Sequence, residues 1–160
     1  MTTTAATITP DMITPFINAV RQVFQKMVRV EATIQTPYLK THAGSTYEVC
    51  GIIGLSGQVT GSVVVSFSDA AAEKLVESFA GTTLDKTSPD FADAIGELAN
   101  MIAGSAKQHL GGRASISTPN VVIGSGYTVA SPSGVPCVVI PCNSPFGKFA
   151  VEVSIKRNAA

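Results

Sequence analysis

The segment Asp93–Leu110, DAIGELANMIAGSAKQHL, has the apolar spacing of an amphipathic helix. At about 100° per residue, one side collects an apolar stripe that we expect to be buried. The stripe consists of Phe91, Ile95, Leu98, Ala99, Ile102 and Ala106. Four other residues are spaced at intervals of four, three and four, and they lie between about 140° and 200° from Ile95 on the helical wheel. These are Asp93, Glu97, Asn100 and Gly104, which we therefore expect to face away from the core.

This outward face is unusual for a helix surface that only meets water. Asparagine is a mediocre helix former, and a glycine in a helix interior costs about 1 kcal/mol relative to alanine. Asp93 and Glu97 place like charges four residues apart, which is mildly unfavourable without a nearby cation. Gly104 leaves room for the backbone of a partner. An ordinary solvated face remains an alternative, but these features favour a surface that binds another molecule.

The rest of the chain predicts an α+β fold in a single domain of residues 1–160, with 1–10 as a flexible N-terminal tail. A largely antiparallel sheet, packed by helices, is built from two pseudo-repeated helix-plus-three-strand units. In the first half we expect a helix over 11–28, a strand over 28–40 and a hairpin over 47–68 that turns at 56–58. A short helix over 69–81 follows. In the second half we expect the long helix from 89 to 110 and strands within 114–130, 134–142 and 146–156, with a turn at 143–145.

Composition excludes several classes of function. Eleven basic residues balance eleven acidic ones, so the chain lacks the positive field that nucleic acids or anionic membranes attract. The N-terminus has no secretory signal pattern, and no apolar run is long enough to span a membrane. We interpret Cys50, Cys137 and Cys142 as reduced core thiols. His42 and His109 lack the spaced ligands of a metal site.

The sequence contains no Ser-His-Asp order, no phosphate-binding glycine loop and no cysteine beside a base. An exposed glutamate without a dry pocket is a poor general base, and asparagine does not titrate. Asparagine can nevertheless hold a water through its donor and its acceptor, while glutamate pairs with a cation on a partner. Positioning a water is sufficient where the scissile bond is labile and a partner supplies the metal, as in an aspartyl phosphate on a signalling protein.

The pattern Asp93-x-x-x-Glu97-x-x-Asn100-x-x-x-Gly104 resembles the signature helix of the CheC/CheX/FliY chemotaxis phosphatases. The segment STPNVVIG at 117–124 resembles the CheX branch of that family. The leading helix, PFINAVRQVFQKM at 15–27, has no acid three residues before an amide on an outer face, which indicates one such site per chain.

The resemblance implies a phosphatase that acts on a phosphorylated CheY-like response regulator receiver in the bacterial cytoplasm. Glu97 and Asn100 would be the catalytic acid and amide, with Glu97 pairing with the receiver's lysine and Asn100 orienting the attacking water. Asp93 and Gly104 would bind the partner. The chain itself would bind no cofactor, Mg²⁺ would come from the receiver, and a homodimer joined through the sheets is expected. The alternative is a non-catalytic receiver-binding or flagellar-switch-related adaptor.

Overall fold

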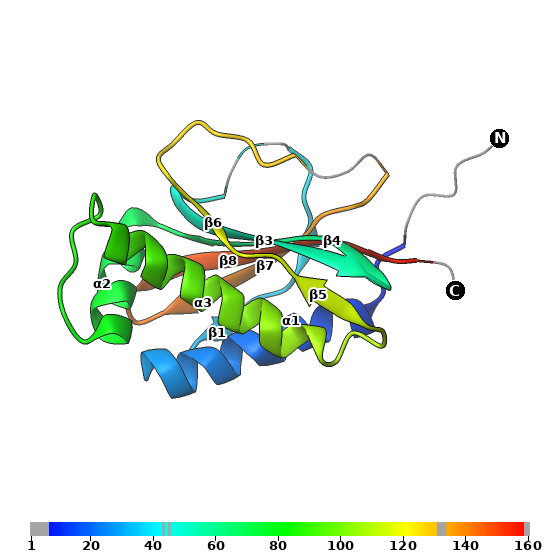
Figure 1. Ribbon diagram of the computed structural model, residues 1–160, viewed down its shortest axis with the longest axis horizontal. Coiled ribbons are helices and arrows are strands. Elements are labelled where there is room, and N and C mark those ends of the chain that lie inside the picture. Colours follow the sequence, from blue (N-terminus) through cyan, green and yellow to red (C-terminus); the bar gives the residue numbers. More distant parts are fainter. Residues whose placement is uncertain (1–6, 43, 45, 131–133, 159–160) are drawn as a thin grey trace.

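The computed structural model describes residues 7–42, 44, 46–130 and 134–158 (Figure 1). Along the chain, the elements are α1 (Pro10–Val23), the π-helix η1 (Phe24–Val28), β1 (Thr33–Ile34), β2 (Tyr38–Leu39), β3 (Val49–Gly57), β4 (Val59–Phe67), α2 (Asp69–Ala80), α3 (Pro89–Lys107), β5 (Ala114–Ile116), β6 (Asn120–Ile123), β7 (Val138–Ser144) and β8 (Gly147–Arg157).

The strands of the described residues form one antiparallel sheet in the order β1-β7-β8-β4-β3-β5, with β2 also pairing with β7 and β6 with β3. The long strands β4 and β8 form the central pair, in which Val63 lies opposite Val153. Each half of the chain contributes a hairpin, β3–β4 or β7–β8. The short strands of each half pair with the hairpin of the other half, so the two halves interlock. This arrangement confirms the predicted α+β class with an antiparallel sheet packed by helices, but each repeated unit contains four strands and not the predicted three, because the strands expected over 28–40 and 114–130 are each two short strands.

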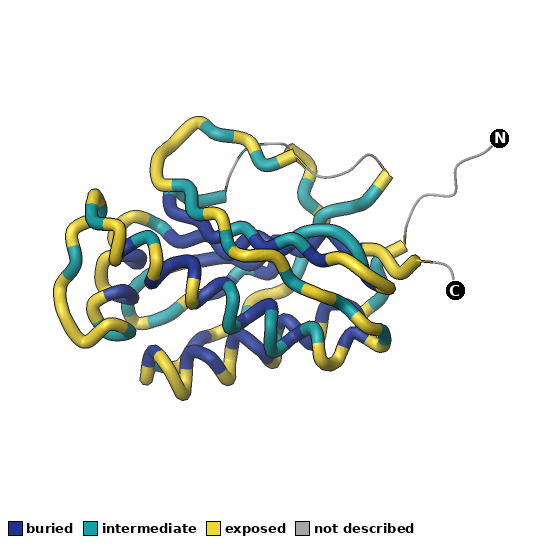
Figure 2. Tube along the Cα trace, in the orientation of Figure 1, coloured by how far each residue is buried: buried dark blue, intermediate teal, exposed yellow. Residues whose placement is uncertain are grey.

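Helices cover one face of this sheet. Figure 1 shows α1 and α3 side by side beneath it, with α2 at the end of the layer. Figure 2 shows that the buried residues of α1 and α3 line the side toward the sheet and the exposed ones the opposite side. All six residues of the predicted apolar stripe of α3 are buried: Phe91, Ile95, Leu98, Ala99, Ile102 and Ala106.

Several local expectations are confirmed in detail. The hairpin β3–β4 turns at Gln58, and Ser68 caps α2 by accepting a hydrogen bond from the Ala71 amide. Gly81 ends α2 with φ of 75°, a conformation that glycine adopts at little cost. The three cysteines are free thiols, with Cys50 and Cys142 buried and Cys137 half-buried.

Other expectations were wrong. The strand predicted over 28–40 is two short strands, β1 and β2, separated around Pro37, which has no amide hydrogen to donate to a ladder. The turn predicted at 143–145 consists of Pro145 and Phe146, because β7 extends through Ser144 and β8 starts at Gly147. Of the predicted tail 1–10, residues 1–6 lie outside the described residues, while Ile8 packs on the core and Pro10 already begins α1.

Within the described part of the chain, none of the helices has both the length and the hydropathy needed to cross a bilayer.

Candidate active site

The predicted acid and amide lie on α3, whose start is fixed by local sequence. Ser88 accepts a hydrogen bond from the Asp90 amide at 3.2 Å, and Pro89 occupies the first turn, where its missing amide hydrogen costs nothing. The buried side of α3 rests closely on β3. A Cβ atom added to Gly51 would lie only 2.7 Å from the Cβ of Ala99, so the glycine is what permits this distance.

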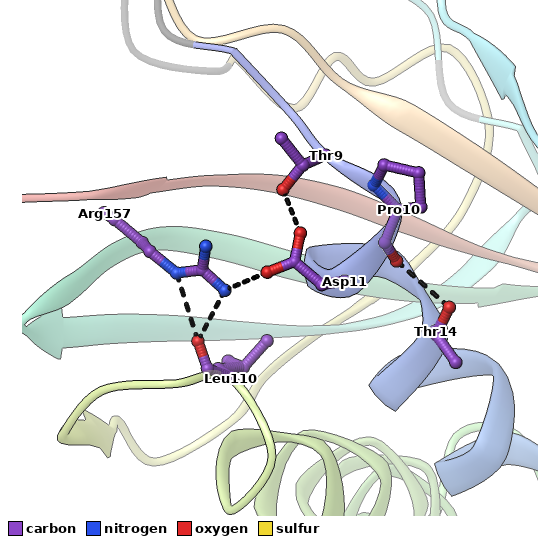
Figure 3. A network of polar contacts seen from close by, with 6 residues as sticks. All are labelled: Thr9, Pro10, Asp11, Thr14, Leu110 and Arg157. Atoms are coloured by element: carbon purple, nitrogen blue, oxygen red, sulfur yellow. Dashed lines mark hydrogen bonds and ion pairs between the residues drawn. The ribbon is translucent and has the colours of Figure 1, made fainter.

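A polar network fixes the segment that follows α3 (Figure 3). The Arg157 side chain donates to the carbonyl oxygen of Leu110 from Nε at 3.2 Å and from Nη2 at 3.0 Å. The same Nη2 lies 2.6 Å from an oxygen of Asp11, and Thr9 donates to the other oxygen of that carboxylate. The hydrogen bond from Thr9, and after it the bond from Arg157, lower the pKa of Asp11. The network therefore joins the start of α1, the end of β8 and the segment after α3.

The four predicted site residues lie on the side of α3 that does not face the sheet, but they are not equally exposed. Asp93 and Glu97 are exposed, as predicted. Asn100 and Gly104 are half-buried, which corrects the expectation that the whole stripe faces solvent. The reason is the segment from β5 to β6, which runs alongside the helix in Figure 1.

The side chains of Glu97 and Asn100 are both available to bind another molecule. Among the described residues, no hydrogen bond or ion pair engages the Glu97 carboxylate or the Asn100 carboxamide. Because residues three apart on a helix are neighbours on its surface, the two side chains can act on one docked molecule. Glu97 offers an unpaired negative charge, and Asn100 offers one acceptor and two donor hydrogens.

Glu97 and Asn100 lie on the side of α3 turned away from the sheet, a helix ridge. Two cavities of about 620 Å³ lie elsewhere, one beside the C-terminal end of α3 and one between α1 and β2. Neither Glu97 nor Asn100 lines them. A helix ridge cannot enclose a small substrate, but it can enter a concave site on another protein. Nor do any three His, Cys, Asp or Glu side chains gather into a possible metal site within the ranges described above.

Three residues that the sequence did not single out as site residues lie at the contact between α3 and the segment that joins β5 to β6, or in that segment: Gly96, Ser117 and Pro119. A Cβ atom at Gly96 would lie 3.0 Å from Cγ of Pro119, so the helix and the strand segment touch there. A local signal existed for Gly96 alone, because Gly96, Asn100 and Gly104 follow one another at intervals of four and so form a second line along the helix, whereas no local pattern placed Ser117 and Pro119 beside it.

The fold and the acid–amide helix place the chain in the class of chemotaxis phosphatases that the motif resembles. Residues 49–143 match the model of the family described as chemotaxis phosphatase CheX, and the chain belongs to that family.

Three relatives illustrate the similarity. The CheY-P phosphatase CheX of Thermotoga maritima is 29% identical over 124 residues, which are 75% of this chain and 80% of that protein. The crystal structure of the chemotaxis protein CheX from Desulfovibrio desulfuricans superposes with a TM-score of 0.83 at 28% identity, covering 92% of this chain and 99% of the other. The crystal structure of the CheX–CheY–BeF3–Mg²⁺ complex from Borrelia burgdorferi contains a chain with a TM-score of 0.76 and 26% identity, covering 91% and 98%.

Proposed function

We propose that this chain is a phosphatase that removes the phosphoryl group from the phosphoaspartate of a CheY-like receiver. The observation that carries the proposal is the exposed, uncommitted Glu97 one helical turn from the uncommitted Asn100, on the ridge of α3, in a member of the CheX family. The name of the Thermotoga maritima relative and the complex from Borrelia burgdorferi support a CheY protein as the substrate.

In the proposed mechanism, α3 enters the receiver's active site. The Glu97 carboxylate pairs with a receiver lysine and so fixes the helix over the phosphoaspartate. The carboxamide oxygen of Asn100 accepts a hydrogen bond from a water, which leaves an oxygen lone pair directed at phosphorus. The water oxygen bonds to phosphorus as the bond to the aspartyl oxygen breaks, and the aspartate leaves as a carboxylate. Mg²⁺ held by the receiver neutralises charge on the phosphoryl oxygens.

Asp93 and Gly104 have supporting roles in the proposal. Asp93 is exposed one turn before Glu97 and adds negative charge to the surface that meets the receiver. At Gly104, the nearest atom to an added Cβ is Cδ1 of Ile116 at 3.8 Å, so the glycine is not required by packing within the chain. A glycine with no internal reason to be small fits a position where a partner approaches closely.

We also propose a cytoplasmic homodimer joined through the sheets, as the family resemblance implies. Sedimentation equilibrium tests the oligomeric state, and a monomer at micromolar concentration would contradict it.

The test of the function is phosphate release from a phosphorylated CheY-like receiver of the same bacterium. We expect the wild-type protein to accelerate release, and Asn100→Ala to remove on the order of 100-fold or more of the acceleration, since it removes the group that orients the water. Glu97→Ala should also impair it. The proposal fails if the wild type binds the receiver without accelerating release, because the chain would then be an adaptor.

Matched controls exist on the other helices. Asn18 lies as far from the first proline of α1 as Glu97 lies from the first proline of α3. Arg21 corresponds to Asn100 in the same way. Asn18 is exposed, as is Glu77 on α2. Asn18→Ala and Glu77→Ala therefore repeat the two chemical changes away from the proposed site, and both should keep the wild-type rate.

A further inference from the structure

The half-buried state of Asn100 has a specific cause in the segment that joins β5 to β6. A Cβ atom at Gly96 would meet Pro119, and one at Gly104 would meet Ile116. The segment thus runs antiparallel to α3 along the line of Gly96, Asn100 and Gly104. Asn100 is midway between the two glycines in α3, and Ser117 and Thr118 lie between Ile116 and Pro119 in the segment, so interpolation between the two contacts places Ser117 and Thr118 beside Asn100.

We propose that the Ser117–Pro119 linker is the support that fixes the Asn100 carboxamide for water positioning, with Ser117 and Gly96 as positioning residues. The inference rests on the proposed phosphatase function, and it adds residues outside the acid–amide motif to the machinery of that site.

The linker is itself held firmly to the sheet at Ser117. Its hydroxyl accepts a hydrogen bond from the Gly54 amide and donates one to the Thr118 carbonyl oxygen, both at 2.9 Å. The Ser117 amide donates to the Gly54 carbonyl oxygen, also at 2.9 Å. Between the end of β5 and the start of β6, the Ser117 hydroxyl thus accepts the hydrogen bond from β3 that a backbone carbonyl oxygen accepts in a regular strand pair. The linker is therefore hydrogen-bonded to β3 at Ser117, although it lies between the strands β5 and β6.

The other side of the contact is the close fit at Gly96. An added Cβ would lie 3.0 Å from Cγ and 3.3 Å from Cβ of Pro119, and 3.4 Å from Cγ2 of Val121. Gly96 itself is buried although it faces the linker and not the sheet. A methyl group there pushes the helix and the linker apart by a few tenths of an ångström, because the proline ring is rigid and has no side-chain rotamer to change.

Such a small shift matters for this chemistry. Water positioning depends on distance and direction, and a displacement of about 1 Å can lower a rate on the order of 100-fold. The ion pair of Glu97 tolerates the shift better, because charge attraction falls slowly with distance. Displacing the support should therefore lower the saturating rate more than the affinity for the receiver.

The first test needs no receiver. In the wild-type protein, nuclear Overhauser contacts are expected between the side-chain amide protons of Asn100 and protons of Ser117 or Thr118. Their absence would overturn the inference whether or not the chain is a phosphatase, so the two hypotheses can fail separately.

The second test separates kcat from KM in the Gly96→Ala variant. Alanine favours helix more than glycine does, so a loss of helix is not expected. We expect kcat for phosphate release to fall about fourfold, which is the part of a roughly 100-fold loss per ångström that a shift of a few tenths of an ångström gives, while KM changes less than about twofold. The double variant Gly96→Ala/Pro119→Ala, which removes the ring from the crowded contact, should recover part of the loss. A wild-type kcat in Gly96→Ala, or a loss confined to KM, would overturn the proposal.

A third pair of variants decides the question if Gly96→Ala does not fold. Ser117→Ala removes the hydroxyl that receives the Gly54 amide, and it should lower kcat with little change in KM. Ser117→Thr retains the hydroxyl and should keep the wild-type kcat. Equal kcat values for the two variants would overturn the role of Ser117, whereas a merely structural role would lower stability without separating kcat from KM.

Discussion

Glu97 and Asn100 differ in how much of their environment the chain itself supplies. Glu97 extends into solvent without a partner among the described residues, whereas Asn100 is half-buried beside the linker. A charge used for docking needs reach, and a group that orients a water needs a fixed position. The difference in burial therefore matches the different roles proposed for the two side chains.

The role of Glu97 predicts a particular dependence on salt. Glu97→Gln keeps the size of the side chain but removes its charge. We expect KM for the phosphorylated receiver to rise about tenfold at low ionic strength, which corresponds to the loss of a charge-assisted contact of about 1.4 kcal/mol. Because salt screens exposed charges, the wild-type KM should rise toward that of the variant as salt is added, while the KM of the variant, in which only the Asp93 charge remains on this surface, should rise less steeply.

The measurement is KM for phosphate release at several salt concentrations, with Glu77→Gln on α2 as a control that should follow the wild type. Parallel salt dependence in the wild type and Glu97→Gln would contradict an ion pair at this residue.

At the scale of elements, helices and hairpins could be predicted from the sequence because their signals are local. The period of the apolar residues in α3 and the Ser-Gly-Gln signal, which ends β3 and turns the hairpin at Gln58, each lie within a few residues of the structure they specify. The pairing of β1 and β2 with β7, and of β5 and β6 with β3, joins segments distant in sequence, and no local period encodes it. For that reason the outward direction of Glu97 was predictable, but the half-burial of Asn100 was not.

One of these long-range connections depends on a buried ion pair. Lys40, just after β2, lies 2.6 Å from a carboxylate oxygen of Glu152 on β8, and Thr46 donates to the same oxygen at 2.9 Å. The two charged side chains are 9% and 4% exposed. Removing only the lysine leaves a buried charge without its partner, so Lys40→Met should destabilise the fold by about 3–5 kcal/mol.

The matched double variant Lys40→Met/Glu152→Gln removes both charges and should recover a large part of that loss. Urea unfolding of the wild type, the two single variants and the double variant gives the coupling free energy directly. Additive effects of the two single variants would show that the pair does not couple β2 to β8. Phosphate release should change little in the variants that remain folded, because the pair lies away from α3.

At the scale of the whole molecule, the interlocked halves form one core, and Cys142 lies inside it on β7, opposite Phe149 of β8. Burial raises the pKa of this thiol from its ordinary value of 9.0 to about 12, and burial also raises the pKa of Cys50 and Cys137. A raised thiol pKa means that the folded chain keeps a proton which the unfolded chain releases. The unfolded state is therefore favoured as pH rises.

This sign predicts stability that is constant near neutral pH and declines between about pH 9 and about pH 12. Over that range Cys142 alone contributes a slope of about 1.4 kcal/mol per pH unit, because its unfolded form is ionised and its folded form is not. The variant Cys142→Val cannot ionise and has a similar volume, so its free energy of unfolding should decline less steeply. Guanidinium unfolding of both proteins at pH 8 and pH 10.5, with a reductant present, measures the difference. If the two proteins lose stability in parallel, Cys142 is not a source of the alkaline decline, and the core around it admits enough water to solvate a thiolate.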